Sequence, residues 1–272
     1  MVVATVLLGA AVLLGSPTSP PRPSLQGPTI VGHRAMGSTH GPTHFSENSR
    51  TAISVAIAHL PAIEVDLRIT KDGHAVVVHD ALVQGRIWER SSDCEAWGKA
   101  IQKVTLSELR GCAFHNGDAV LDLSEFLSLL QAAPSVSTSE IFFDLKMPTE
   151  SSREVLHALV EQIGRDLDPR FIPVFQARNK AAAQALVALR ADGTTFPPRG
   201  KIFVLSNVAV NGKKWKHMGV DGLSINHRAI TKSTAVRYQR AGLEVAVWTV
   251  SKSEVRRRLQ RLPLDYLIAD RP

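Results

Sequence analysis

From Pro28 to the C-terminus, short apolar runs alternate with longer amphipathic stretches. The runs have the length of buried strands, whereas the longer stretches repeat apolar residues at the spacing of a helix. Alternating strands and helices favour parallel pairing, and this many strands fit an α/β fold of the (β/α)8 TIM-barrel type better than an open sheet. The strands are expected at residues 29–34, 63–70, 141–146, 171–176, 201–205, 222–225, 244–250 and 266–269. The helices are expected at residues 50–59, 124–131, 152–164, 180–190, 233–241 and 253–261.

Three segments depart from this alternation. Lys71-Asp72-Gly73 precedes a further extended run at residues 75–78, and an Asp-Gly pair in that position is typical of a tight hairpin. Residues 82–117 have mixed polarity and are expected to form an excursion between barrel strands. Residues 207–219 are too short for a good helix, so the unit there is expected to be degenerate.

The N-terminus has a different composition. Residues 2–14 form an apolar run, followed by Gly15, Ser16 and a Pro- and Ser-rich stretch. This pattern is typical of a signal peptide, although no Lys or Arg precedes the run, and it predicts a secreted or extracytoplasmic protein. A disordered, mildly apolar tail is the alternative. The expected domains are residues 1–27, a signal peptide or disordered segment, and residues 28–272, the barrel.

Composition and charge narrow the class of protein. Apolar residues make up 44% and charged residues 21% of the chain, as is ordinary for a soluble globular protein. The net charge of +7 favours anionic partners, so peripheral contact with an anionic membrane surface stays open. No basic stretch is interleaved with aromatic residues, so nucleic acid is not an expected partner. Cys94 and Cys112 suit one disulfide in an exported protein better than a zinc site.

The most informative stretch is Ile63-Glu64-Val65-Asp66-Leu67. Alternate side chains of a strand share a face, so Glu64 and Asp66 point to one side and the apolar residues to the other. Two carboxylates inside a barrel repel each other and resist desolvation unless a cation joins them. The stretch therefore predicts a cation site, and a strand end with two solvated acids is the alternative.

A second strand repeats this arrangement, because Phe142-Phe143-Asp144-Leu145-Lys146 places Asp144 and Lys146 on one face. Three carboxylates from neighbouring strands form an oxygen-rich site that suits one divalent cation, Mg²⁺ or Ca²⁺, rather than zinc. Lys146 would then lie beside the metal as a point charge for an anionic substrate. An ordinary Asp–Lys pair is the alternative.

Two histidines end extended runs. Gly32-His33-Arg34 closes the first strand and His79 closes the hairpin arm, and active sites of (β/α)8 barrels lie at the carboxyl ends of strands. Histidine titrates near neutrality and acts as a general acid or base, whereas Arg34 offers a forked donor for a phosphate. A lone histidine there would more often be structural, but two of them near a carboxylate cluster favour catalysis.

Together these residues resemble the glycerophosphodiester phosphodiesterase family of the phospholipase C-like phosphodiesterase superfamily. The resemblance covers nearly everything from Pro28 onward, and the ordered set is more specific than any one motif. Its motifs are Gly32-His33-Arg34, Glu47-Asn48, Ile63-Glu64-Val65-Asp66, Thr70-Lys71-Asp72-Gly73, Val78-His79-Asp80, Val247-Trp248-Thr249-Val250 and Ile268-Ala269-Asp270-Arg271-Pro272.

The resemblance implies a barrel with a small insertion at about residues 81–118 and a site of three groups of residues. The implied ligands of one divalent cation are Glu64, Asp66 and Asp144. The implied acid–base residues are His33 and His79. The implied substrate- and phosphate-binding residues are Arg34, Lys146, Glu47, Asn48 and Trp248. For Trp248, a core position is a nearly equal alternative.

The sequence also departs from the family pattern. Ala35 stands where a glycine usually follows His-Arg, and a longer segment at residues 36–46 contains His40 and His44, which we interpret as loop residues. Asp144 stands where the family more often has glutamate. Asp-Leu-Lys at this strand is similar to sphingomyelinase D and phospholipase D toxins, which are related to the family.

Three functions remain in view. The leading hypothesis is metal-dependent hydrolysis of glycerophosphodiesters to glycerol 3-phosphate and an alcohol by His/His acid–base catalysis. The alternative is toxin-like cleavage of lysophospholipids or sphingomyelin through a cyclic phosphate. The third is a barrel that only binds phosphodiesters or anionic surfaces, which the complete set of site residues disfavours. The oligomeric state and the assignment of acid and base to the histidines stay open.

Overall fold

The computed structural model describes residues 27–38, 45–134, 136–147 and 153–272. It contains one nine-stranded sheet in which β3 pairs antiparallel with β2. The other strands pair in parallel, and β1 pairs with both β9 and β2, so the sheet closes on itself. The strands are β1 Thr29–Gly32, β2 Ala62–Ile69, β3 Ala75–Val77, β4 Glu140–Leu145, β5 Ile172–Ala177, β6 Lys201–Ser206, β7 Gly222–Asn226, β8 Glu244–Val250 and β9 Tyr266–Ala269.

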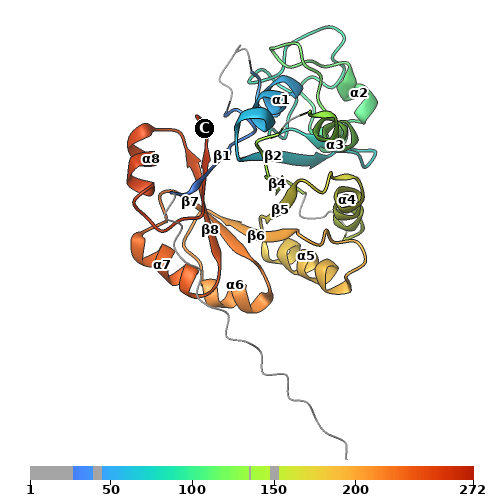
Figure 1. Ribbon diagram of the computed structural model, residues 1–272. Coiled ribbons are helices and arrows are strands. Elements are labelled where there is room, and N and C mark those ends of the chain that lie inside the picture. The colour runs from blue at the N-terminus through green and yellow to red at the C-terminus, as the bar shows by residue number, and fades with distance from the viewer. Residues whose placement is uncertain (1–26, 39–44, 135, 148–152) are drawn as a thin grey trace, which may run out of the picture.

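Helices alternate with these strands and surround them, which confirms the predicted (β/α)8 barrel (Figure 1). The helices are α1 Arg50–His59, η1 Ile101–Lys103, α2 Leu106–Arg110, α3 Leu123–Ala132, α4 Arg153–Asp166, α5 Lys180–Asp192, α6 Gly212–Met218, α7 Lys232–Arg240 and α8 Ser253–Leu259. The expected hairpin is formed by β2 and β3.

The prediction of a degenerate unit at residues 207–219 was wrong, because α6 lies there. The side chain of Asn211 accepts a hydrogen bond from the amide of Lys214, which satisfies one of the free donors of the first turn. Gly219 ends the helix in the left-handed conformation with φ of 102°. Local caps at both ends thus define a helix that is too short to show a clear apolar period.

The segment between β3 and α3 has an apolar cluster of its own beside the barrel. Trp88 and Phe114 are buried in it with ring centroids 4.6 Å apart. Cys94 and Cys112 form a disulfide within the same segment. The short helix α2, which we did not expect, begins at a capping box formed by Thr105 and Glu108.

The barrel interior is filled on the side of the strands' amino ends. Phe142, Phe203 and Tyr266 meet edge to face, with ring centroids 5.0 to 6.0 Å apart. Beneath them, Nζ of Lys201 contacts the carboxylates of Glu140 and Glu244 at 2.8 and 2.9 Å. These packed side chains close the barrel interior at the amino ends of the strands, so the polar side chains lie at the carboxyl ends.

Two expectations concern residues outside this description. The expected signal peptide lies, except for residue 27, outside the described residues, and so do His40 and His44. Within the described part of the chain, no helix has both the length and the apolar character needed to cross a membrane.

Candidate active site

Three carboxylates meet inside the barrel. Glu64 and Asp66 lie on the inward face of β2, and Asp144 lies on β4, directly paired in register with Asp66. Ligand oxygens of all three lie within 4.8 Å of one another, and the three residues are between 1% and 4% exposed. The structure therefore brings together the three residues that we predicted as metal ligands.

The electrostatics of this cluster are unfavourable for three bare charges. Burial and the neighbouring charges of Asp66 and Asp144 raise the pKa of Glu64 well above its usual value. Burial also acts to raise the pKa of Asp66, but Lys146 and Arg34 outweigh it and hold that pKa below its usual range. The carboxyl group of Glu64 would therefore need a further positive charge nearby to be ionised.

The cluster fits a hard divalent cation. Asp66 Oδ1 is buried and accepts no hydrogen bond from the described residues, although Lys146 Nζ lies 3.0 Å away. Asp66 Oδ2, by contrast, accepts a hydrogen bond from Asn48 at 2.8 Å. Lys146 offsets part of the charge of Asp66 Oδ1, and an all-oxygen set of three buried carboxylates suits Mg²⁺ or Ca²⁺. These three residues could hold such an ion.

Two cations contact Asp144. Lys146 Nζ lies 2.9 Å from its Oδ2, and Arg178 donates from Nε and Nη2 at 2.7 and 2.6 Å. The sequence reasoning missed Arg178. Its position directly after β5 was the available signal, because side chains at strand carboxyl ends converge in this fold.

His33 lies at the end of β1 and is held by a carboxylate that we did not assign a role. Its Nδ1 lies 2.7 Å from Oδ1 of Asp270, which directly follows β9. The side chains of Ser38 and Ser251 donate to the same carboxylate at 2.7 and 2.5 Å. Burial acts to raise the pKa of Asp270, but these bonds outweigh it and lower that pKa. An ionised Asp270 holds the proton on Nδ1 and leaves Nε2 for other partners.

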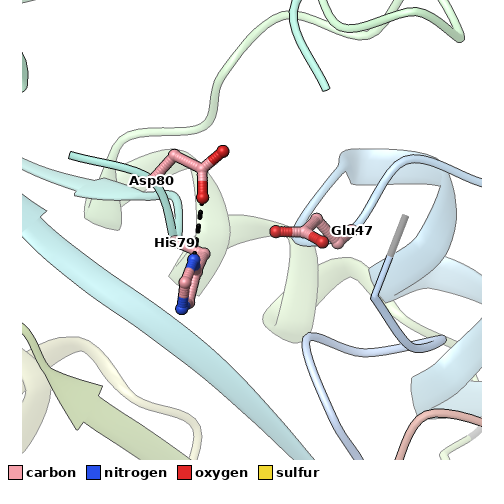
Figure 2. Close-up of side chains that lie close together, drawn as sticks. All are labelled: Glu47, His79 and Asp80. Atoms are coloured by element: carbon pink, nitrogen blue, oxygen red, sulfur yellow. Dashed lines mark hydrogen bonds and ion pairs between the residues drawn. The ribbon is translucent and has the colours of Figure 1, made fainter. Parts of the chain in front are cut away.

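His79 follows β3 and has an equivalent partner. Its Nδ1 lies 2.9 Å from Oδ1 of Asp80, and Nε2 points away from Asp80 (Figure 2). The backbone carbonyl of His79 accepts a bond from Nε of Arg68 at 2.8 Å. Burial lowers the pKa of His79, partly offset by the bond to Asp80. Arg68 lies two residues after Asp66 on the same face of β2, so strand periodicity was a signal for it.

The three carboxylates, the two histidines, Lys146 and Arg178 line one pocket together with apolar side chains. Trp248 is fixed in it by a bond of 2.9 Å from its Nε1 to the carbonyl of Ser224. The lining comprises His33, Arg34, Glu64, Asp66, His79, Asp144, Lys146, Gln176, Arg178, Leu205, Trp248, Thr249 and Ile268. Eight of the ten residues predicted for the site are in this lining, namely His33, Arg34, Glu64, Asp66, His79, Asp144, Lys146 and Trp248.

The other two predicted residues, Glu47 and Asn48, lie one layer behind the lining. Glu47 accepts a bond of 2.7 Å from Nη1 of Arg34, and its side chain is fully buried. Asn48 donates to Asp66, and its Oδ1 accepts from the backbone amide of Asp66 at 3.3 Å. In this structure both residues hold lining residues in place instead of facing the pocket themselves.

Comparisons with known proteins agree with this geometry. Residues 33–272 match the model of the glycerophosphoryl diester phosphodiesterase family. No curated protein matches the sequence.

Solved structures share the fold at low sequence identity. An Oleispira antarctica phosphodiesterase in complex with the product sn-glycerol-3-phosphate is 18% identical, with a TM-score of 0.72 and coverage of 90% of this chain and 94% of that one. A Parabacteroides distasonis glycerophosphodiester phosphodiesterase is 20% identical, with a TM-score of 0.70 and coverage of 90% and 93%. A Thermotoga maritima glycerophosphodiester phosphodiesterase is 19% identical, with a TM-score of 0.62 and coverage of 90% and 96%.

Proposed function

Because the chain belongs to the glycerophosphoryl diester phosphodiesterase family and is a phosphoric diester hydrolase, we propose that it cleaves glycerophosphodiesters to glycerol 3-phosphate and an alcohol in this pocket. The observation that supports this best is the pair of histidines, each with a carboxylate on Nδ1, in the lining that also contains the three buried acids. Such a pair can move two protons in one displacement at phosphorus.

The phosphate would be bound by the cations of the lining. Arg34, Lys146 and Arg178 all line the pocket. Nε of Arg34 makes no hydrogen bond to the described residues and only a long ion-pair contact of 3.6 Å with Oδ2 of Asp66, so it has donor capacity left for a phosphate oxygen. Positive groups fixed in this way stabilise the charge that develops on the phosphoryl oxygens in the transition state.

Glu64, Asp66 and Asp144 would hold one divalent cation, Mg²⁺ or Ca²⁺. When bound, the ion supplies Lewis-acid polarisation of a phosphoryl oxygen. The side chains of the chain itself then set the position of the diester between the two histidines. Leu205, Trp248 and Ile268 contribute apolar side chains to the same lining, which would contact the part of the substrate that carries no charge.

Each histidine handles one proton. One neutral imidazole takes the proton of the attacking water or of the substrate's neighbouring hydroxyl as its oxygen bonds to phosphorus. The other, as an imidazolium, gives a proton to the alkoxide oxygen as the bond from phosphorus to that oxygen breaks. Attack by the neighbouring hydroxyl gives a cyclic phosphate, which water then opens with the roles exchanged. The histidine left neutral takes the proton of water as its oxygen bonds to phosphorus, and the histidine left protonated gives its proton to the ring oxygen as the bond from phosphorus to that oxygen breaks.

A second candidate is cleavage of a lysophospholipid or of sphingomyelin in the manner of the toxin relatives. The observation that favours it is the presence of Leu205, Trp248 and Ile268 in the lining, which would contact the start of a lipid chain. Asp144-Leu145-Lys146 also follows the pattern of those toxins.

Phosphorus NMR of the purified protein with glycerophosphocholine and lysophosphatidylcholine in one tube separates the two candidates. We expect a signal of glycerol 3-phosphate from the first substrate, present with Mg²⁺ or Ca²⁺ and absent with a chelator. Loss of the lipid alone, with a cyclic phosphate as product, would replace the first candidate by the second. Stability of both compounds would refute both.

We also propose that the protein acts outside the cytoplasm. The disulfide between Cys94 and Cys112 supports this, since disulfides persist mainly in oxidising compartments. Cell fractionation of the native host tests it: we expect the protein in the extracytoplasmic fraction, and recovery in the cytosol would contradict the proposal.

A further inference from the structure

A second group of acidic and histidine side chains lies beside the pocket. Ligand atoms of Glu47, His79 and Asp80 lie within 4.8 Å of one another, and the carboxylate of Glu47 points toward the other two (Figure 2). This group has an internal cation. Arg86, which belongs to the segment between β3 and α3, donates to Glu47 from Nη1 and Nη2 at 2.6 and 2.5 Å. It also donates to Asp80 from Nε and Nη2 at 3.0 and 2.8 Å.

Arg86 thereby connects two residues of the pocket lining. Asp80 leads to His79 through the bond of 2.9 Å to Nδ1. Glu47 leads to Arg34 through the bond of 2.7 Å from Nη1. His79 and Arg34 both line the pocket, whereas Arg86 does not. Arg86 is therefore connected by two successive hydrogen bonds to His79, a candidate catalytic residue. It is connected in the same way to Arg34, a candidate phosphate-binding residue.

We propose that Arg86 is a positioning residue, which orients the imidazole of His79 through Asp80 and the guanidinium of Arg34 through Glu47. The proposal rests on the proposed roles of His79 and Arg34. The segment between β3 and α3 would then be part of the active site, because it supplies the side chain that orients the imidazole of His79 and the guanidinium of Arg34.

The physical reason is the balance of charge in a buried group. The side chain of Glu47 is fully buried, and that of Asp80 is 19% exposed. Two carboxylates this close repel each other, and a planar guanidinium can hold both at once with its forked donors. Without it, Asp80 would turn toward solvent and release the imidazole of His79, and Glu47 would draw Arg34 away from the pocket.

The segment holds Arg86 in place from two sides. The amide of Val83 donates to the carbonyl of Lys99 at 3.0 Å, and the amide of His115 donates to the carbonyl of Ile87 at 2.9 Å. The two stretches that contain Lys99 and His115 are connected by the disulfide between Cys94 and Cys112. Arg86 is thus anchored by backbone bonds on both flanks, as a residue that positions others needs to be.

The test compares Arg86→Gln and Arg86→Lys with Arg110→Gln. Arg110 is a control in the same segment, because its ion pairs with Asp122 and Glu125 include no residue of the pocket lining. Turnover of glycerophosphocholine and the nitrogen NMR signals of His79 are measured, with His33 as an internal reference. For Arg86→Gln we expect kcat to fall by about 10- to 100-fold, with the tautomer signal of His79 changed and that of His33 unchanged. The kcat of Arg86→Lys should lie between those of the wild type and Arg86→Gln, since an ammonium keeps the charge but lacks the forked donors of a guanidinium.

The proposal is overturned if the His79 signals and kcat of Arg86→Gln and Arg86→Lys equal those of wild type and Arg110→Gln. If Arg86→Gln does not fold, the result for the lysine variant decides alone. His79→Ala, measured beside them, keeps the two claims apart. Full activity of His79→Ala would remove the proposed function of that histidine, whereas an inactive His79→Ala with unchanged Arg86 variants would remove the positioning role alone.

Discussion

At the scale of single residues, the pocket contains two histidines that are held in the same way. His33 is bound at Nδ1 by Asp270 and His79 by Asp80, and each carboxylate has further donors that keep it ionised. A carboxylate on Nδ1 fixes the tautomer and the ring plane, so that Nε2 is the nitrogen available for proton transfer. Two such pairs would suit the proposed displacement, which needs one proton removed and one supplied.

Replacing the carboxylate of the first pair should therefore impair catalysis. We expect Asp270→Asn to lower kcat by about 10²-fold or more with a small change in KM, because the amide no longer fixes the imidazole of His33. Steady-state kinetics on glycerophosphocholine measures this. Ser251→Ala is the matched control, since it removes one donor from Oδ2 of Asp270 and leaves the bond at Oδ1. Equal rates for Asp270→Asn and wild type would refute the role.

The same carboxylates predict how stability depends on pH. Burial acts to raise the pKa values of Asp80 and Asp270, but both are held below their usual range. Bonds to histidine, together with Arg86 for Asp80 and two serines for Asp270, outweigh burial. Their contribution to the free energy of unfolding is therefore complete above a pH of about 4 and is lost as the pH falls toward the pKa values of the folded state. Denaturant unfolding between pH 2 and 6 should show this loss, and it should be shallower in Asp270→Asn. An identical slope in both proteins would contradict the assignment.

The residues that sequence reasoning found and missed have a common explanation. Glu64, Asp66, Asp144 and the two histidines could be found because strand periodicity and strand ends place them locally. The partnership of His33 and Asp270 joins residues 237 positions apart, and the partnership of Arg86 and Glu47 joins residues 39 apart. No local pattern encodes such pairs, because they exist only after the barrel has closed.

At the scale of elements, the strands were easier to predict than the helices between them. β8 and β9 have the expected bounds, since buried parallel strands appear as continuous apolar runs. The seven-residue α6 was missed because its limits are set by the cap at Asn211 and the left-handed Gly219 rather than by an apolar period.

The segment between β3 and α3 was expected only as an excursion, and its disulfide gives it a testable role. We expect that Cys94→Ser with Cys112→Ser, which removes a bridge across 18 positions, costs about 2–4 kcal/mol of the stability of this segment. Because the segment holds Arg86, turnover should fall together with it. Hydrogen exchange at residues 82–117 and kcat measure the two effects.

Reduction of the wild type provides the control for this variant. Dithiothreitol should bring the wild type to the level of the double variant and leave the double variant unchanged. Full activity of the reduced protein would show that the disulfide does not support the position of Arg86.

At the scale of the whole molecule, barrel closure produces the site. Pairing of β1 with both β2 and β9 brings the end of the chain beside its first strand, so that Asp270 reaches His33. The register of β2 and β4 sets Asp66 opposite Asp144. Because the amino ends of the strands are filled by aromatic and charged side chains, the polar groups are concentrated at the carboxyl ends, as is general for this fold.

The central claim is that this closed barrel hydrolyses a glycerophosphodiester with a divalent cation and two histidines. The most direct measurement is the rate of glycerol 3-phosphate release from glycerophosphocholine by wild type, His33→Ala and His79→Ala, each with Mg²⁺ or Ca²⁺ and with a chelator. Circular dichroism of each variant verifies the fold. We expect release by the wild type when the cation is present, and a loss of about 10²-fold or more in either variant or with the chelator. Release by a folded His33→Ala or His79→Ala at the rate of the wild type, or undiminished release in the chelator, would contradict it.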